Sequence, residues 1–90
     1  MRGEKVLVRA YGDRPLVRVI WDWDPREDVV YITDEDGLVK LLSGDDGPLP
    51  IGFHRDDVFL FDIQGVKAVQ QEYATGGQVN WSHLHQWGSQ

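Results

Sequence analysis

Four short apolar runs separated by acidic turns occupy residues 16–63 of this 90-residue chain. The runs are rich in β-branched and aromatic residues and read LVRVIWDW, DVVYIT, LVKLL and VFLFDI. The breaks around them are DPRED, DEDG, SGDDGPLP and HRDD. Runs of this length that are bounded by Gly, Pro and Asp are typical of β-strands joined by turns. The pattern predicts a small, mainly β structure, and no motif within it specifies a reaction.

Apolar alternation predicts five strands, at residues 5–11, 16–23, 29–33, 38–42 and 58–63. In the second segment, strict alternation would place four residues on one face: Val17, Val19, Trp21 and Trp23. Asp36-Gly37 is a favoured pair for a tight hairpin turn, which would make residues 38–42 a return strand. Because residues 58–63 are apolar on both faces, we expect this strand to be central in the sheet.

The period changes after residue 64, where apolar residues fall at helical spacing. We therefore predict a short helix at residues 65–75, ended by Gly76-Gly77. Residues 78–90 form either an added strand that docks on the sheet or a frayed tail. The expected organisation is a single domain, 1–90, with a core at 5–63 and a short 3₁₀ turn at 54–57.

This order of elements resembles an SH3-like small β-barrel of five to six short antiparallel strands with one short C-terminal helix. The residues that carry the resemblance are the DEDG turn and the stretch PIGFHRDDVFLFD, in which a polar turn leads directly into a strand. The ALYDY run of peptide-binding SH3 domains is absent, so the resemblance does not imply binding of proline-rich peptides. The chain also resembles small acidic bacterial proteins, which implies no particular activity.

The net charge of −6 is unevenly distributed. Residues 1–21 carry a net charge of +3, whereas residues 22–62 contain three basic and twelve acidic residues, a net charge of −9. An acidic field repels phosphate backbones and favours a partner with a basic segment. The chain has no cysteine, and MRGEKVLV contains no long apolar stretch. We therefore expect a cytoplasmic location, no membrane association, no disulfide and no cofactor.

The favoured function is a non-catalytic protein-interaction or regulatory module. Aromatic anchors with a charged rim are typical of binding patches. The predicted partner-binding residues are Trp23, Tyr31, Phe53, Asp24 and Asp28. If Leu16 and Ile20 are exposed, they would form a sheet-to-sheet dimer contact, so we expect a monomer or a weak homodimer.

The alternative function is nucleic-acid binding through a basic and aromatic face of a small barrel. The residues that would form this face are Arg9, Tyr11, Arg14 and Arg18. The charge of −9 in the centre of the chain opposes this alternative.

Metal binding and catalysis have weak candidates. His83 and His85 would share one side of a strand, which suits zinc or nickel, but packing of the imidazoles between tryptophans is favoured. The crowded aspartates are expected to cap backbone N–H groups in turns rather than to bind a cation. No serine lies in a G-x-S-x-G motif, and His54 next to acidic residues in a turn is expected to be exposed, so we predict no enzyme activity.

Overall fold

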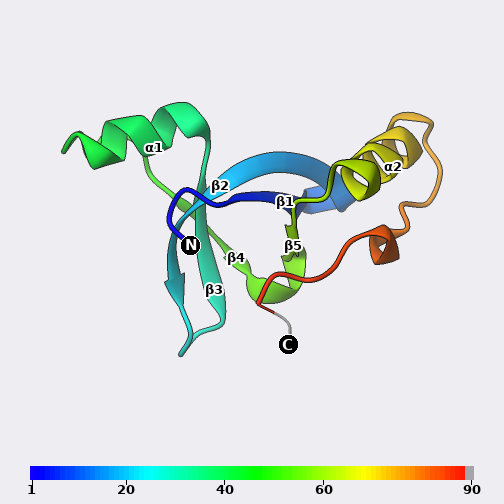
Figure 1. The fold of residues 1–90 in the computed structure, drawn as a ribbon, viewed down its shortest axis with the longest axis horizontal. Coiled ribbons are helices and arrows are strands. Elements are labelled where there is room, and N and C mark those ends of the chain that lie inside the picture. Colours follow the sequence, from blue (N-terminus) through cyan, green and yellow to red (C-terminus); the bar gives the residue numbers. More distant parts are fainter. Residues whose placement is uncertain (89–90) are drawn as a thin grey trace.

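The first strand of the chain, β1 (Lys5–Ala10), lies inside a five-stranded antiparallel sheet with the strand order β4-β3-β2-β1-β5 (Figure 1). The other strands are β2 (Arg14–Asp24), β3 (Val29–Thr33), β4 (Ile51–His54) and β5 (Val58–Leu60). The α-helices are α1 (Glu35–Leu42) and α2 (Ile63–Ala74), and the 3₁₀ turns are η1 (Tyr11–Asp13), η2 (Arg55–Asp57) and η3 (Trp81–His83). This computed structural model describes residues 1–88. The mainly β class is confirmed, and the sheet is open, with β4 and β5 at its two ends.

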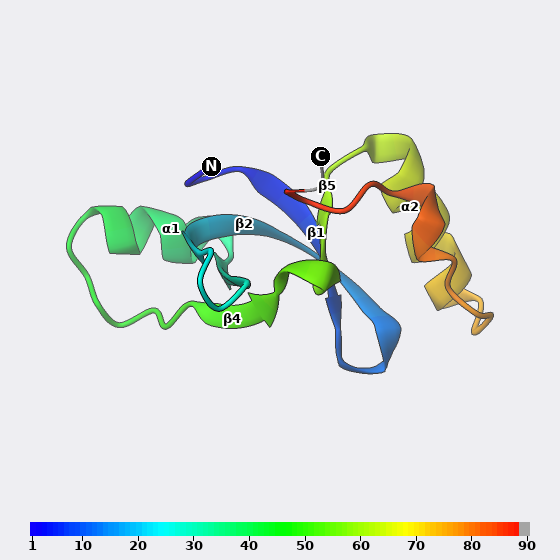
Figure 2. The same cartoon turned by 90° about the horizontal axis from the view of Figure 1, so that it is seen from below.

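Apolar side chains are buried on both faces of the sheet. On one face, which we call the Val6 face, the cluster comprises Val6, Val8, Ile20, Val30, Ile32, Val58 and Trp87. On the other, the Leu7 face, the sheet residues Leu7 and Phe59 pack with residues of α2 and the C-terminal segment, namely Val66, Val69, Val79, Trp81 and Leu84. Figure 2 shows α1 and α2 at opposite ends of the molecule. α2 and the C-terminal segment cover the Leu7 face of β1, and side chains of β2, β3 and β5 pack with its Val6 face. β1 is therefore buried on both faces.

A β-bulge in β2 overturns the strict alternation expected for residues 16–23. Ile20 pairs with Ile32 and Asp22 pairs with Tyr31, so Trp21 is an extra residue in β2. The bulge places Trp23 on the same face as Ile20, against the Val6-face cluster. Ile20 is 0% exposed, so the prediction that it is available for a dimer contact is wrong.

Residues 34–42 form the N-cap and helix α1, which corrects the predicted DEDG hairpin and return strand. The side chain of Asp34 caps the helix by accepting a hydrogen bond from the amide of Gly37 at 2.7 Å. Asp36 and Lys40 form an ion pair at 3.2 Å across one helical turn. Gly37 permits close packing rather than a turn, because a side chain there would overlap the hydroxyl of Thr33. Asp-Gly alone does not distinguish a hairpin from a capped helix.

β5 is the last strand of the sheet, so the prediction of a central position for residues 58–63 is wrong. Its outer edge is covered by the C-terminal segment through two main-chain hydrogen bonds, from Leu60 N to His85 O at 2.8 Å and from Trp87 N to Val58 O at 2.9 Å. β5 is apolar on both faces because Val58 belongs to the Val6-face cluster and Phe59 to the Leu7-face cluster. Burial on both faces therefore does not require a neighbouring strand on each side. The predicted helix at 65–75 is confirmed as α2. The segment predicted at 78–90 packs against the sheet as far as it is described, and residues 89 and 90 lie outside the described part.

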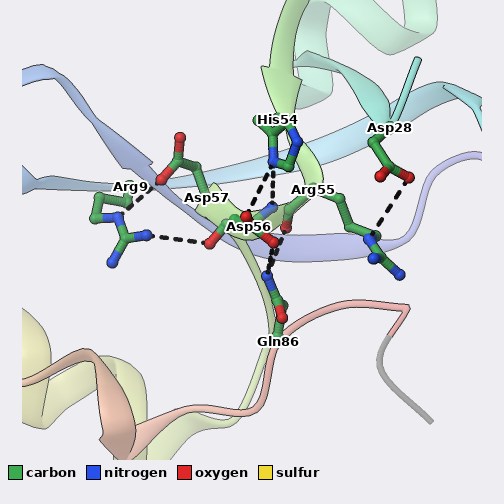
Figure 3. A network of polar contacts seen from close by, with 7 residues as sticks. All are labelled: Arg9, Asp28, His54, Arg55, Asp56, Asp57 and Gln86. Carbon is green, nitrogen blue, oxygen red and sulfur yellow. Dashed lines mark hydrogen bonds and ion pairs between the residues drawn. The ribbon is translucent and has the colours of Figure 1, made fainter.

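The predicted 3₁₀ turn is confirmed as η2, and polar contacts connect it to distant parts of the chain (Figure 3). Arg9 on β1 forms an ion pair with Asp57 at 2.9 Å. The side-chain amide of Gln86 donates to the carboxylate of Asp56 at 2.7 Å. These contacts hold the β4–β5 connection against β1 and the C-terminal segment. Among residues 1–88, neither α-helix has the length and apolar character needed to cross a membrane.

The cap of α1 gives a direct test of this helix. Replacing Asp34 with Ala removes the acceptor for the Gly37 amide and a negative charge at the helix N-terminus, so we expect a loss of stability of about 1 kcal/mol. Urea denaturation followed by circular dichroism measures the effect. The control is Asp46→Ala, which removes an exposed aspartate from the following loop. Equal stability of the two variants would contradict the capping role.

Candidate functional site

A cleft of about 590 Å³ opens between α1, the loop at residues 43–50 and the Val6 face of the sheet. Apolar residues from three strands line it, namely Leu16, Ile32, Ile51 and Phe53. The strand register places all four on the Val6 face, because Ile32 pairs with both Ile20 and Ile51, Phe53 pairs with Val30, and Leu16 pairs with Val8. The cleft is therefore an uncovered continuation of the same apolar face that forms the first core.

The apolar side chains at the mouth of the cleft are accessible to a partner. Leu49 is 83% exposed and Ile51 is 63% exposed. They lie on either side of Pro50, where the loop enters β4. Leu16, by contrast, is half-buried within the cleft. Two exposed aliphatic residues next to a preformed hollow provide apolar area that a bound segment can cover.

Charged groups around the cleft leave its lining net negative. Three carboxylates, those of Asp34, Asp36 and Asp45, line it together with the cations of Arg18 and Lys40. The hydrogen bond and charge of Asp36 raise the pKa of Lys40, and the charges of Asp45 and Asp34 act in the same direction. The ammonium group therefore lies in the field of all three carboxylates. Arg18 Nη1 donates to the carbonyl of Val17 at 2.8 Å.

The structure brings together two of the five predicted partner-binding residues. Trp23 and Phe53 both pair with Val30, so they occupy one rung of the sheet on the Val6 face. Both are half-buried, and the Trp23 ring packs edge-to-face against Trp87 at 5.2 Å between ring centroids. Tyr31 lies on the opposite face of the sheet, in register with Asp22 and Gly52.

The predicted acidic partners of these aromatics have local roles. Asp24 accepts a hydrogen bond from the amide of Arg26 at 3.0 Å, as expected for a turn aspartate. Asp45 caps Gly47 in the same way at 2.8 Å. The carboxylate of Asp28 lies 3.8 Å from Arg55 Nε, a separation that permits ionic attraction but is too long for a hydrogen bond.

The four residues of the predicted basic face are not on one face. Arg18 pairs with Val6 and so shares its face, whereas Arg9 lies on the Leu7 face. The guanidinium of Arg9 is paired with Asp57 and lies 5.4 Å from the ring centroids of both Phe59 and Trp81. Arg14 and Tyr11, which is 100% exposed, lie around the β1–β2 turn.

His83 contacts a carboxylate rather than lying between tryptophans. Its Nε2 lies 2.8 Å from Glu72 Oε2, while His85 is exposed. Glu72 also accepts a hydrogen bond from the amide of Asn80 at 2.8 Å, so it connects α2 to the segment that contains η3. Within residues 1–88 no three or more His, Asp or Glu side chains are grouped closely enough to hold a metal ion.

Sequence reasoning missed most of the cleft because it assigned residues 38–42 to a strand. The predicted hairpin makes Asp34 and Asp36 turn residues, and the alternation pattern assigns no role to Leu49 and Ile51. The available signal was a helix N-cap aspartate followed by apolar residues at helical spacing, then an exposed apolar pair around a proline. Comparisons with protein-family models, curated proteins and solved structures find no match to this chain.

The Glu72 contact predicts a pH-dependent contribution to stability. The hydrogen bonds from Asn80 and then His83 lower the pKa of Glu72 from its usual value. The contribution is therefore present above the unfolded-state pKa of about 4.3 and is lost as pH falls through the lower folded-state pKa. We expect the urea midpoint of Glu72→Gln to be lower than that of the natural protein at pH 7. The difference between the two midpoints should be smaller at pH 3, where the carboxylate becomes protonated. A difference that does not change with pH would contradict this role of the charge.

Proposed function

We propose that the chain is a non-catalytic protein-interaction module whose cleft between α1 and β4 binds an extended segment of a partner protein. The observation that carries the proposal is the combination of an apolar hollow with two exposed aliphatic residues at its mouth, Leu49 and Ile51. A bound segment that covers them removes apolar surface from water, which is the main favourable term in most protein association. Phe53 extends this surface toward Trp23 on the same face.

The proposed partner segment carries Lys or Arg in addition to apolar residues. The lining of the cleft has three carboxylates and two cations, and residues 22–62 as a whole carry a net charge of −9. Complementary charge speeds association and selects against acidic competitors. The same charge opposes pairing of two copies through this surface, because their carboxylates would meet.

An SH3-like barrel is the fold relationship that we propose for the sheet. The strand order β4-β3-β2-β1-β5 supports it, as does the position of η2 directly before β5. Helix α1 between β3 and β4 would then be an insertion that forms one wall of the cleft.

Peptide selection with matched variants tests the interaction function. We expect peptides selected from a displayed random library against the natural protein to be rich in apolar and basic residues. Their affinity should fall about tenfold or more in the double variant Leu49→Ala/Ile51→Ala, because apolar anchors at the cleft are removed. The matched control is Val39→Ala/Leu42→Ala, which truncates two aliphatic residues of α1 that are 64% and 61% exposed but do not line the cleft.

Fluorescence anisotropy with the selected peptides measures both affinities. Selected peptides that bind both double variants equally, or that are mainly acidic, would refute the cleft as the binding surface. Thermal melts of the two variants show whether each remains folded.

Nucleic-acid association at the β1–β2 turn is the second candidate function, favoured by the full exposure of Tyr11 beside the exposed Arg14. Stacking of a base on an exposed aromatic residue next to a cation is a common mode of single-strand binding. If this function holds, a mixed-sequence single-stranded DNA should bind at 20 mM salt and lose affinity in Tyr11→Ala and Arg14→Ala. The protein-interaction function predicts the opposite result, no DNA binding even at that salt concentration, because a net charge of −6 repels phosphates; anisotropy of labelled DNA distinguishes the two functions.

A further inference from the structure

The two ends of the sheet differ in how their outer edges are covered. The C-terminal segment pairs with the outer edge of β5 and places Trp87 in the Val6-face cluster. The outer edge of β4 has no main-chain hydrogen bond to any other part of residues 1–88. An uncovered edge presents unpaired N–H and C=O groups, which can accept another strand.

The register of β3 and β4 shows which groups point outward. The amide of Arg55 donates to the carbonyl of Asp28 at 2.9 Å, so this pair is a hydrogen-bonded rung. Hydrogen-bonded and non-hydrogen-bonded rungs alternate in an antiparallel pair. Val30–Phe53 and Ile32–Ile51 are therefore hydrogen-bonded rungs. Gly52 and His54 lie in the intervening rungs, so their N–H and C=O groups point away from β3.

The side chains around this edge differ between the two faces. Ile51 and Phe53 face the cleft, so an added strand would place its neighbouring side chains on that face beside the apolar lining. On the other face, Gly52 has no side chain, and two side chains of β3 approach it: a Cβ atom at Gly52 would be 2.9 Å from Val29 Cγ1 and 3.4 Å from Tyr31 Cε1. Because Gly52 itself has no side chain, a long side chain on the added strand opposite Gly52 can extend across it toward the Tyr31 ring.

We propose that the partner segment binds as an additional β-strand along the outer edge of β4, with alternating apolar and basic residues. This inference rests on the proposed interaction function and specifies how the segment binds. The residue opposite Gly52 is Lys or Arg, because it meets the Tyr31 ring on a face that also carries the carboxylate of Asp22. The residues before and after it are apolar and enter the mouth of the cleft, next to Ile51 and Phe53. Main-chain hydrogen bonds to Gly52 and His54 provide affinity, and the alternation of apolar and basic residues in the partner segment provides specificity.

His54 permits a test that removes one outward N–H group with little change to the backbone. Its φ of −62° is the value that proline adopts, and its N–H group does not bond to β3. His54→Pro therefore removes a donor from the free edge. His54→Ala is the reference, because both variants lose the imidazole that accepts a hydrogen bond from the amide of Asp56, but only the proline variant loses the outward N–H.

The probe is the labelled peptide SVKVKVS, with SVEVEVS as its acidic counterpart, at 150 mM salt. We expect SVKVKVS to bind His54→Ala about tenfold more tightly than His54→Pro, and SVEVEVS not to bind the natural protein. Hydrogen exchange by NMR on the natural protein provides a second measurement that requires no variant. Saturating SVKVKVS should slow exchange of the Gly52 and His54 amides, which point outward.

Any of the following outcomes would overturn strand addition. The first is equal affinity of both His54 variants for SVKVKVS, which indicates ionic attraction alone. Absence of protection of the Gly52 and His54 amides in the complex would equally exclude added main-chain hydrogen bonds. The second is no binding of SVKVKVS at 1 mM, while library-selected peptides still depend on Leu49 and Ile51; in that case the interaction function stands and only this binding mode fails. The third is a dimer in sedimentation that His54→Pro dissociates, which would assign the edge to a second copy of the chain.

Discussion

Burial of β1 on both of its faces is the constraint on which the rest of the structure depends. Val6 and Val8 face one apolar cluster, Leu7 faces the other, and all three are fully buried. Complete burial of such side chains stabilises a fold by roughly 1.5–3 kcal/mol each, but only where both faces are covered. A 90-residue chain achieves this with one sheet, because α2 and the segment around Trp81 cover the Leu7 face. The C-terminal segment then crosses the edge of β5 and contributes Trp87 to the opposite face.

This use of the C-terminal segment explains why the two ends of the sheet differ. One end is paired and covered, whereas β4 has no strand or segment of residues 1–88 on its outer edge and lies beside a cleft with apolar walls. Two residues of η2, Asp57 and Asp56, bond to Arg9 and Gln86, respectively. Because η2 directly follows β4, these bonds fix the position of the C-terminal end of β4. The aspartates in the turns have two effects. Individually they cap α1 and the turns, and together with the other charged residues they give residues 22–62 a net charge of −9.

The parts of the fold that were predicted correctly depend on local periodicity. Four of the five expected strands are present, as are α2 and the 3₁₀ turn η2, because alternation, helical spacing and turn residues each act over a few neighbours. The strand expected at 58–63 is shorter than predicted, since β5 ends at Leu60 and Ile63 already belongs to α2. The errors arose where local chemistry permits two structures or where long-range pairing decides. Asp34 and Gly37 suit a hairpin as well as a capped helix. In the helix, Gly37 packs so closely against Thr33 that a side chain would not fit, and this contact cannot be read from the Asp-Gly pair. The bulge at Trp21 depends on pairing with β3, which no pattern within residues 16–23 reveals.

The amino-acid sequence by itself determined the mainly β class, the position of α2, the acidic centre of the chain and the aspartates that cap its turns. These properties follow from backbone preferences and from charges that can be counted along the chain. Only the tertiary structure decided that Trp23 and Phe53 share a face while Tyr31 does not, and that Arg9 and Arg18 lie on opposite faces. It also decided that, in the described part of the chain, the uncovered edge belongs to β4 rather than to β5. The physical reason is that strand register and edge coverage depend on contacts between residues far apart in the chain, above all the packing of Trp87 from the C-terminal segment against the sheet.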